Sequence, residues 1–219
     1  MTPTPLTGFI IHSRPYQEKR AIYQLFSREW GVVHGVGKHG LPSFVELECF
    51  VTGKTSLKNF SQIHPKSTLP STHFGQSQYA LLYLNELICK LIALENPCPS
   101  LWCAYQKSVS DLQKANDLTA IKRILRDFET SLFDELGVSI DWTSDSVGRT
   151  IDPDEFYEFV PNTGFVRSKV GLLGEMILAM NDKSNLNTLG QIHRQVIDFL
   201  LDYKPLNSRK LWAEHLKYR

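Results

Sequence analysis

The chain has 219 residues, of which 42% are hydrophobic and 21% are charged, so it has the composition of a globular protein with room for one large domain or two modest ones. Its four cysteines form no C-x-x-C pair, and their spacing indicates neither a zinc ribbon nor a redox motif. The most apolar segment, Ala80–Leu94, is interrupted by polar residues, and the N-terminus lacks a signal-peptide pattern. We therefore expect a soluble, cytoplasmic protein without a membrane partner.

Positive charge is concentrated near the N-terminus. Residues 1–70 contain eight Lys or Arg and four Asp or Glu, a balance of +4, whereas the rest of the chain contains 16 against 19, a balance of −3. A basic segment joined to a mildly acidic one favours a polyanion as partner of the first segment. A surplus of four charges also lies within ordinary variation, so charge alone leaves this question open.

The N-terminal part of the chain is predicted to form five strands. They cover Phe9–Pro15, Ala21–Phe26, Trp30–Val36, Phe44–Thr52 and Leu57–Ile63. Apolar and acidic residues alternate in Val45–Cys49, which indicates that one face of this strand meets a core and the other meets water. Short strands with glycine-bearing turns are typical of a small closed barrel such as an OB-fold. We expect four aromatic residues to fill its core, namely Phe9, Phe26, Trp30 and Phe50.

The segment Gly35–Gly40 matches G-x-G-x-x-G, the fingerprint of dinucleotide-binding proteins. That fingerprint needs a helix directly after the glycines and an acidic residue about twenty positions later. Here Leu41-Pro42 and a further strand follow, and Thr55–Ile63 contains no acid. A P-loop is also disfavoured, because His39 stands where Ser or Thr would bind magnesium. The interpretation that remains is an inter-strand loop presenting Lys38 to a phosphate.

The segment His64–Ser77 contains two prolines and a glycine, and it is predicted to connect two domains. Helices are predicted over Tyr79–Leu94, Pro99–Ala115, Leu118–Leu136, Val170–Met180, Leu186–Tyr203 and Ser208–Lys217. Phe156–Val166 is predicted to form a short hairpin or ordered loop with a turn at Pro161–Gly164. The fold class is therefore α+β and multi-domain: an OB-fold barrel over residues 1–72, then a mainly α-helical domain over residues 73–219 with a hairpin insert near residues 141–168.

Cations on the predicted strand ends and loops of the barrel are candidates for DNA binding. They are Arg14, Lys19, Arg20, Arg28, Lys38, Lys54 and Lys58. Tyr16, Tyr23, Trp30 and Phe60 are interleaved with them. Nonspecific binding of single strands combines phosphate neutralisation with stacking on aromatic rings, which contributes about 1–3 kcal/mol per base.

The predicted helix Leu118–Leu136 carries a second cluster of cations, Lys122, Arg123 and Arg126, beside apolar residues. Such a surface fits a short acidic peptide that ends in a bulky hydrophobic residue. The alternative is a solvated helix face whose charge is balanced by Asp127 and Glu129.

No catalytic constellation is visible in the sequence. The seven histidines form neither H-x-H nor H-E-x-x-H, and there is no G-x-S-x-G nucleophile elbow. Asp152, Asp154 and Glu155 surround Pro153, a pattern that favours a solvated turn over a cation site. We therefore expect no enzymatic activity, no cofactor and no bound metal.

Several short segments are each weak signals but are specific in combination. They are Ile11–Pro15, Tyr83–Ile88, Leu125–Glu129 with Leu136-Gly137, Gly164-Phe165 and Lys204–Arg209. In this order and at this spacing they resemble the RecO family of bacterial recombination mediators, along most of the chain. The resemblance implies an N-terminal OB-fold and a helical C-terminal domain, in agreement with the pattern of strands and helices.

The resemblance also implies a function. It implies binding of single- and double-stranded DNA, annealing of complementary strands, contact with the acidic C-terminal tail of single-stranded DNA-binding protein, and a complex with RecR. Together these would load RecA at gaps, in a cytoplasmic, nucleoid-associated protein. Arg126 matches a basic position suited to the acidic tail, whereas Asp127 stands where some relatives have a second arginine. Some members carry a four-cysteine zinc site after this helix, but Asp141–Pro161 contains no cysteine, so we expect no zinc.

Two other classes of protein remain open from the sequence. One is an adaptor whose barrel binds peptide or RNA and which has no annealing activity. The other is a nucleotide-dependent enzyme that uses the glycine-rich loop, and protection by nucleotides against thermal unfolding would reveal it.

Overall fold

The computed structural model describes residues 2–66, 75–182 and 185–217. Contacts divide the chain into two compact units. Unit 1 comprises residues 1–121 and 206–219, and unit 2 comprises residues 122–205. Residues 67–74, which are part of the predicted inter-domain connection, lie outside the described residues. The predicted domain boundary after residue 72 falls within this range and therefore remains a prediction.

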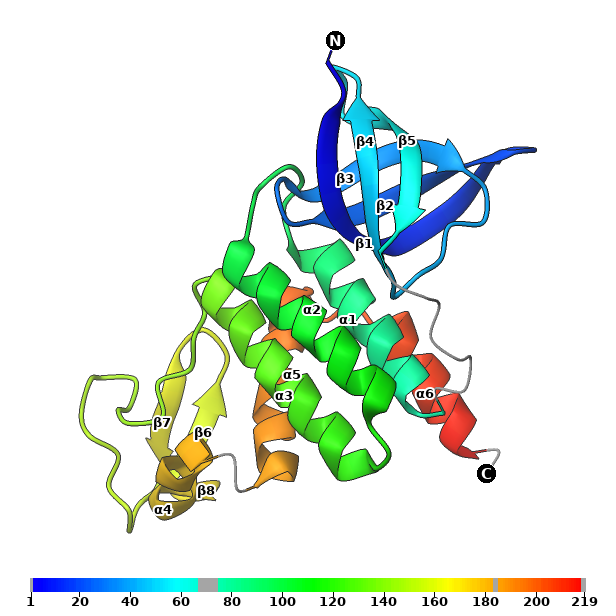
Figure 1. Ribbon diagram of the computed structural model, residues 1–219. Helices are drawn as coiled ribbons and strands as arrows, with labels where there is room; N and C mark the ends of the chain where they lie inside the picture. Colours follow the sequence, from blue (N-terminus) through cyan, green and yellow to red (C-terminus); the bar gives the residue numbers. More distant parts are fainter. Residues whose placement is uncertain (1, 67–74, 183–184, 218–219) are drawn as a thin grey trace. The chain divides into compact units, whose positions relative to one another are not determined.

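Five strands of unit 1 close into a barrel in the order β1-β2-β3-β5-β4 (Figure 1). The strands are β1 Thr4–Gln17, β2 Arg20–Ser27, β3 Gly31–Lys38, β4 Glu46–Thr52 and β5 Leu57–Pro65. All neighbours are antiparallel except β3 and β5, which pair in parallel. The barrel followed by helices confirms the predicted α+β class and the OB-type barrel.

The strand β1 is longer than predicted. It continues through Pro15, which pairs with Ala21, and ends at Gln17. Proline has no backbone N–H and is tolerated where a strand has a free edge. The pairing of β1 with β4 covers only Thr4–Phe9, so the far end of β1 pairs with β2 alone and has such an edge. The predicted end at Pro15 is therefore wrong.

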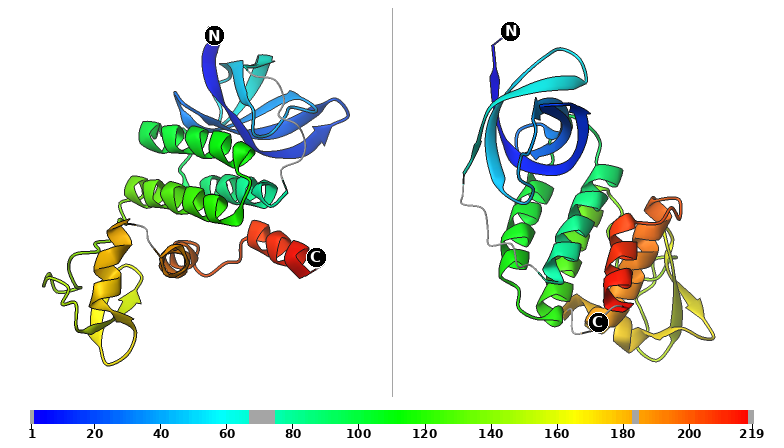
Figure 2. Two further views of the ribbon diagram at one scale, coloured as in Figure 1. Left: turned by 60° about the horizontal axis from the view of Figure 1, so that its bottom comes forward. Right: turned by 90° about the vertical axis from the view of Figure 1, so that its right-hand side faces the viewer.

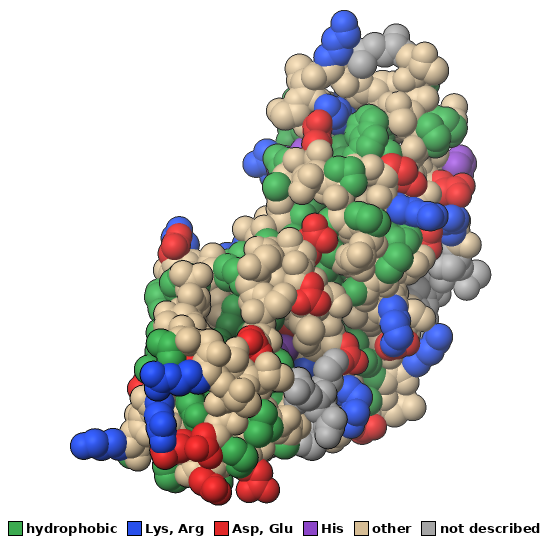
Figure 3. Space-filling view, turned by 90° about the vertical axis from the view of Figure 1, so that its left-hand side faces the viewer, with side chains coloured by type: hydrophobic (Ala, Val, Ile, Leu, Met, Phe, Trp, Pro, Cys, Tyr) green, Lys and Arg blue, Asp and Glu red, His purple; other side chains and the backbone are tan. Residues whose placement is uncertain are grey.

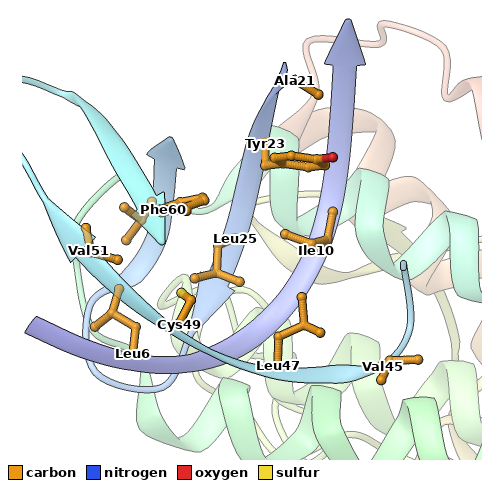
Figure 4. Close-up of a cluster of buried hydrophobic side chains, with 11 residues drawn as sticks. Leu6, Ile10, Ala21, Tyr23, Leu25, Val45, Leu47, Cys49, Val51 and Phe60 are labelled. Carbon is orange, nitrogen blue, oxygen red and sulfur yellow. The ribbon is translucent and has the colours of Figure 1, made fainter. Parts of the chain in front are cut away.

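Side chains from all five strands fill the interior of the barrel (Figure 4). They are Leu6, Ile10, Ala21, Tyr23, Leu25, Val33, Val45, Leu47, Cys49, Val51 and Phe60. The hydroxyl of Tyr23 donates to the backbone carbonyl of Lys38 at 2.8 Å, which satisfies the one polar group of this ring. Tyr23 and Phe60 thus belong to the core and are not exposed platforms for bases.

Unit 1 also contains three helices, α1 Ser77–Leu91, α2 Pro99–Lys114 and α6 Asn207–Lys217. Figures 1 and 2 show α1 and α2 side by side, next to the barrel. Glu86 of α1 accepts hydrogen bonds from the backbone N–H groups of Asn207 at 2.9 Å and Ser208 at 2.8 Å. A carboxylate is favourable at the N-terminus of a helix. Burial raises the pKa of Glu86, but the hydrogen bonds from Ser208 and Asn207 outweigh it and hold this pKa below its usual value.

The outer face of β1 and β2 packs against α2. The rings of Phe9 and Phe26 lie edge-on to Tyr105, with centroids 5.3 Å and 5.4 Å away. The expectation that they fill the barrel core is wrong, because strand alternation turns them outward and toward the helix. Phe50 likewise lies between two inward-facing neighbours and is only half-buried, while Trp30 packs against the core as a partly buried ring.

Unit 2 contains most of α3 and a small sheet of order β7-β6-β8. Its elements are α3 Leu118–Glu135, β6 Phe156–Val160, β7 Gly164–Ser168, β8 Leu172–Leu173, α4 Gly174–Leu178, the 3-10 helix η1 Ala179–Asp182, and α5 Leu186–Leu200. The strands β6 and β7 form a hairpin. The predicted helix Val170–Met180 is wrong in its first half, because Leu172-Leu173 pairs with β6 and the helix begins only at Gly174.

The glycines of the G-x-G-x-x-G segment serve the barrel. Gly35 and Gly37 lie in β3, and Gly40 follows it with a φ of 84°, a conformation that favours glycine. A Cβ on Gly35 would lie 2.5 Å from the ring of Phe60, which covers this position. The elements that follow the glycines are β4 and β5, so no helix N-terminus is present to hold a dinucleotide.

We expect Gly35→Ala to lower the free energy of unfolding by about 1–3 kcal/mol, the usual cost of overpacking a core. Chemical denaturation of the full chain measures this change. The matched control is Gly37→Ala in the same strand, where the nearest atom is the flexible end of Ile63 at 3.3 Å. Equal losses in the two variants would contradict the role assigned to Phe60.

Candidate nucleic-acid interface

Four of the predicted DNA-contacting cations gather at one end of the barrel. They are Arg14, Lys19, Arg20 and Lys38, here called the basic ribbon. Arg20 is in register with Gln17 of β1 and with Lys38 of β3. Lys19 lies in the turn between β1 and β2, and its carbonyl accepts a hydrogen bond from the backbone N–H of His39 at 3.0 Å. All four side chains of the ribbon are exposed.

A β-bulge in β1 extends this polar surface along the outside of the barrel. Ile10 pairs with the inward-facing Leu25, but the next pair is His12 with Gln24, so Ile11 is the extra residue. Such a bulge changes the face to which the following side chains point. His12, Gln24 and His34 consequently form a row across β1, β2 and β3.

The next row, two residues further along β1, contains Arg14, Ile22 and Val36, so Arg14 of the basic ribbon lies beside the row of His12. Burial lowers the pKa of His34, and the charges of Arg14 and His12 lower it further. The imidazole of His34 is therefore neutral at neutral pH. Tyr16, which follows on β1, has 51% of its surface exposed and is an aromatic ring that a base can reach beside the ribbon.

The other three predicted cations lie elsewhere. Arg28 is at the opposite end of β2 from Arg20, and its guanidinium lies 6.0 Å from the ring centroid of Trp102. Lys54 is in the turn between β4 and β5. Lys58 is buried, and its ammonium lies 2.9 Å from a carboxylate oxygen of Glu95. The structure thus does not bring these three side chains together with the basic ribbon.

Lysines and arginines also occur outside the basic ribbon, but there they are mixed with other side chains. On the face shown in Figure 3, lysines and arginines are interspersed with acidic and hydrophobic side chains. Within unit 1, the pairing of β1, β2 and β3 brings the four exposed cations of the basic ribbon together. An acidic residue, Glu18, lies beside Lys19 in the turn between β1 and β2.

The cation cluster of α3 is largely engaged within unit 2. Lys122 donates to the side-chain oxygen of Asn187 at 2.9 Å, whereas Arg123 is exposed. Arg126 donates to Glu129 at 2.7 Å, and its side chain is 14% exposed. A Cβ on Gly190 would lie 2.5 Å from this guanidinium, so the glycine of α5 leaves the space in which Arg126 packs.

Glu129 is the centre of a buried polar network that sequence analysis missed. Its side chain has no exposed surface, and its second oxygen lies 2.8 Å from Nδ1 of His193. The ring of His193 lies edge-on to Phe133. The interpretation of Glu129 as a solvated counter-charge is wrong. The sequence contained one indication of this, because Glu129 is four residues after the buried Leu125 and residues at this spacing share a helix face.

No catalytic or metal centre emerges from the described part of the chain. Within it, no three His, Cys, Asp or Glu side chains are close enough to hold a metal ion. Burial, and secondarily the charge of Glu29, raises the pKa of Cys49 to about 12. Burial and then the charge of Glu86 raise the pKa of Cys89 to about 12. Both are therefore protonated thiols at neutral pH, which are poor nucleophiles and poor metal ligands.

None of the helices in the described ranges is both long enough and apolar enough to span a lipid bilayer.

These features define a class of protein, in which an OB-type barrel with an exposed cationic end is joined to a helical region. Barrels of this type bind oligonucleotides in many proteins. The family model described as "Recombination protein O C terminal" matches residues 75–209. The DNA repair protein RecO of Pseudoalteromonas atlantica is 32% identical over 240 residues, covering 100% of this chain and 98% of the relative. That of Stutzerimonas stutzeri is 33% identical over 222 residues, covering 94% and 92%. The chain belongs to the RecO family, which has a role in DNA repair.

Proposed function

We propose that this protein is a non-enzymatic recombination mediator. It binds single- and double-stranded DNA, anneals complementary strands and, together with RecR, helps to load RecA on strands coated by single-stranded DNA-binding protein. The observation that carries the proposal is the basic ribbon, because four exposed cations on three adjacent strands and the turn between β1 and β2 present a surface that can follow a phosphate backbone. We place this activity in the cytoplasm, at the nucleoid.

Annealing by this route needs no bond chemistry. Two complementary strands repel each other through their phosphates, and cations that neutralise these charges lower the repulsion. The basic ribbon supplies such cations on β1, β2, β3 and the turn between β1 and β2, whereas base pairing supplies the driving force. The reaction therefore requires no nucleotide, metal or cofactor.

We assign the acidic tail of single-stranded DNA-binding protein to the face of α3 that carries Lys122, Arg123 and Arg126. Arg123 is exposed, so a carboxylate can reach it directly. Arg126 is paired with Glu129, so its charge is less available to the tail than that of Arg123. Asp127 is exposed on the same helix, and its negative charge weakens the attraction for the tail.

Annealing of complementary strands tests this proposal, with naked strands and with strands coated by single-stranded DNA-binding protein that has or lacks its acidic tail. We expect acceleration on naked strands at low salt, acceleration on fully coated strands, and loss of the second effect when the tail is removed. Arg123→Glu is expected to act like tail removal and to spare naked strands. Failure to accelerate annealing of naked strands at low salt would overturn the proposal.

A further inference from the structure

A pocket of about 360 Å³ lies within unit 1, where the outer face of β1 and β2 meets α1 and α6. His12 and Gln24 line it from the barrel, and Leu82, Asn85 and Cys89 line it from α1. Leu211 of α6 also lines it and is 48% exposed. The pocket is thus bounded by elements from both ends of the chain.

The pocket continues the surface that leads from the basic ribbon. His12 and Gln24 are partners in the same row of the sheet, and Arg14 is two residues beyond His12 on β1. The bulge at Ile11 is what places His12 on this outer face. Arg14, a member of the ribbon, thus lies one row of the sheet away from the residues that line the pocket.

One polar side chain of the pocket has unused hydrogen-bonding capacity. The side-chain oxygen of Gln24 is buried and has no partner among the described residues. Asn85 is 5% exposed, and its oxygen accepts a hydrogen bond from the hydroxyl of Tyr105 at 2.6 Å, which directs the oxygen toward α2. A buried acceptor without a partner is costly, so it marks a place where a ligand can supply the missing hydrogen bond.

Most of the exposed surface of the remaining lining is apolar. The charged and polar residues in it are engaged with one another, because Glu86 pairs with Lys90 and accepts hydrogen bonds from the backbone N–H groups of Asn207 and Ser208. Leu82 and Leu211 contribute aliphatic side chains, and the thiol of Cys89 is protonated and behaves as a small hydrophobic group. Apolar walls combined with a few hydrogen-bonding groups suit a flat ligand that has apolar faces and a polar edge. A nucleobase has this character, whereas an aliphatic side chain of a protein partner would leave the oxygen of Gln24 unpaired.

We propose that this pocket takes one unstacked nucleobase of a single strand whose backbone follows the basic ribbon. The inference rests on the proposed DNA-binding function and adds a site to it. A base in a duplex is stacked and paired, and it cannot enter without breaking those interactions. The pocket accordingly makes the full-length protein prefer single strands over duplex DNA of the same length.

The test compares Leu211→Trp, which obstructs the mouth of the pocket, with Leu216→Trp on the same helix. Leu216 is 54% exposed, so both substitutions place an indole on an exposed position, but only Leu211 lines the pocket. The probes are a short single-stranded oligonucleotide containing 2-aminopurine, the same backbone made entirely of abasic nucleotides, and a duplex. Circular dichroism verifies that both variants are folded.

We expect the wild-type protein to shield 2-aminopurine from acrylamide quenching and to bind the base-bearing strand about tenfold more tightly than the abasic one, a difference of about 1.4 kcal/mol. Leu211→Trp should lose both effects and keep its affinity for the duplex, while Leu216→Trp should behave as wild type. If abasic and base-bearing strands bind the wild type equally, the pocket is not a base site but the basic ribbon stands. If no strand binds at low salt, the proposed function and the pocket both fail.

Discussion

Replacing Glu129 with alanine is expected to lower the free energy of unfolding by about 3–5 kcal/mol. The carboxylate has no exposed surface and lies within hydrogen-bonding distance of both Arg126 and His193. Its removal leaves the guanidinium of Arg126, which is only 14% exposed, without its counter-charge. An uncompensated buried charge costs much more than the pair itself contributes, and this asymmetry makes the expected loss large.

Urea denaturation followed by circular dichroism measures this loss. Glu135→Ala is the matched control, because Glu135 is on the same helix and exposed, and we expect a change within about 0.5 kcal/mol. Glu129→Gln keeps the shape and one acceptor, so its loss should lie between those of the alanine variant and the control. A loss for Glu129→Ala no larger than for Glu135→Ala would show that the network does not stabilise unit 2.

Reversing three charges of the basic ribbon is expected to weaken binding of single-stranded DNA about a hundredfold at low salt. The variant is Arg14→Glu, Arg20→Glu and Lys38→Glu. Each phosphate contact that is lost also reduces the slope of log affinity against log salt concentration by about one, so the slope should become less steep by about three. Fluorescence anisotropy of a labelled oligonucleotide at several salt concentrations measures both quantities.

The control for this variant changes net charge by the same amount at other exposed sites of unit 1. It carries Lys114→Glu, Lys210→Glu and Lys217→Glu, on α2 and α6. We expect it to keep most of the affinity and nearly the whole salt slope, since long-range attraction is screened within about 10 Å at 0.1 M salt. Equal losses in the two triple variants would mean that net charge, and not the ribbon, governs binding.

The barrel was predictable because β4 alternates apolar and acidic residues, and because the other strands are short segments rich in β-branched and aromatic residues between glycine-bearing turns. What alternation does not reveal is the partner of the second face. Phe9 and Phe26 could be identified as buried, but their contact with Tyr105 joins residues about eighty positions or more apart in the chain. The bulge at Ile11 is equally invisible, because it depends on the register between β1 and β2.

The candidate site was predictable only as a set of residue types. Register, which the sequence does not display, brings Arg20 beside Lys38 and leaves Arg28 at the far end of β2. Lys58 was named as a cation on a strand end, yet it is buried against Glu95, a residue that follows α1. Ion pairs between distant segments decide which cations stay accessible, and they form only when the chain has folded.

Unit 1 is discontinuous along the chain, since its last helix, α6, follows unit 2 in the sequence. During synthesis on a ribosome, the barrel and its first helices emerge well before their final partner. Glu86 then has no N-terminus of α6 to cap, and the ring of Tyr79 lacks the stacked Trp212. A polypeptide that lacks α6 therefore exposes an incomplete surface of unit 1 that chaperones and proteases can recognise, and only chains that include α6 complete this unit.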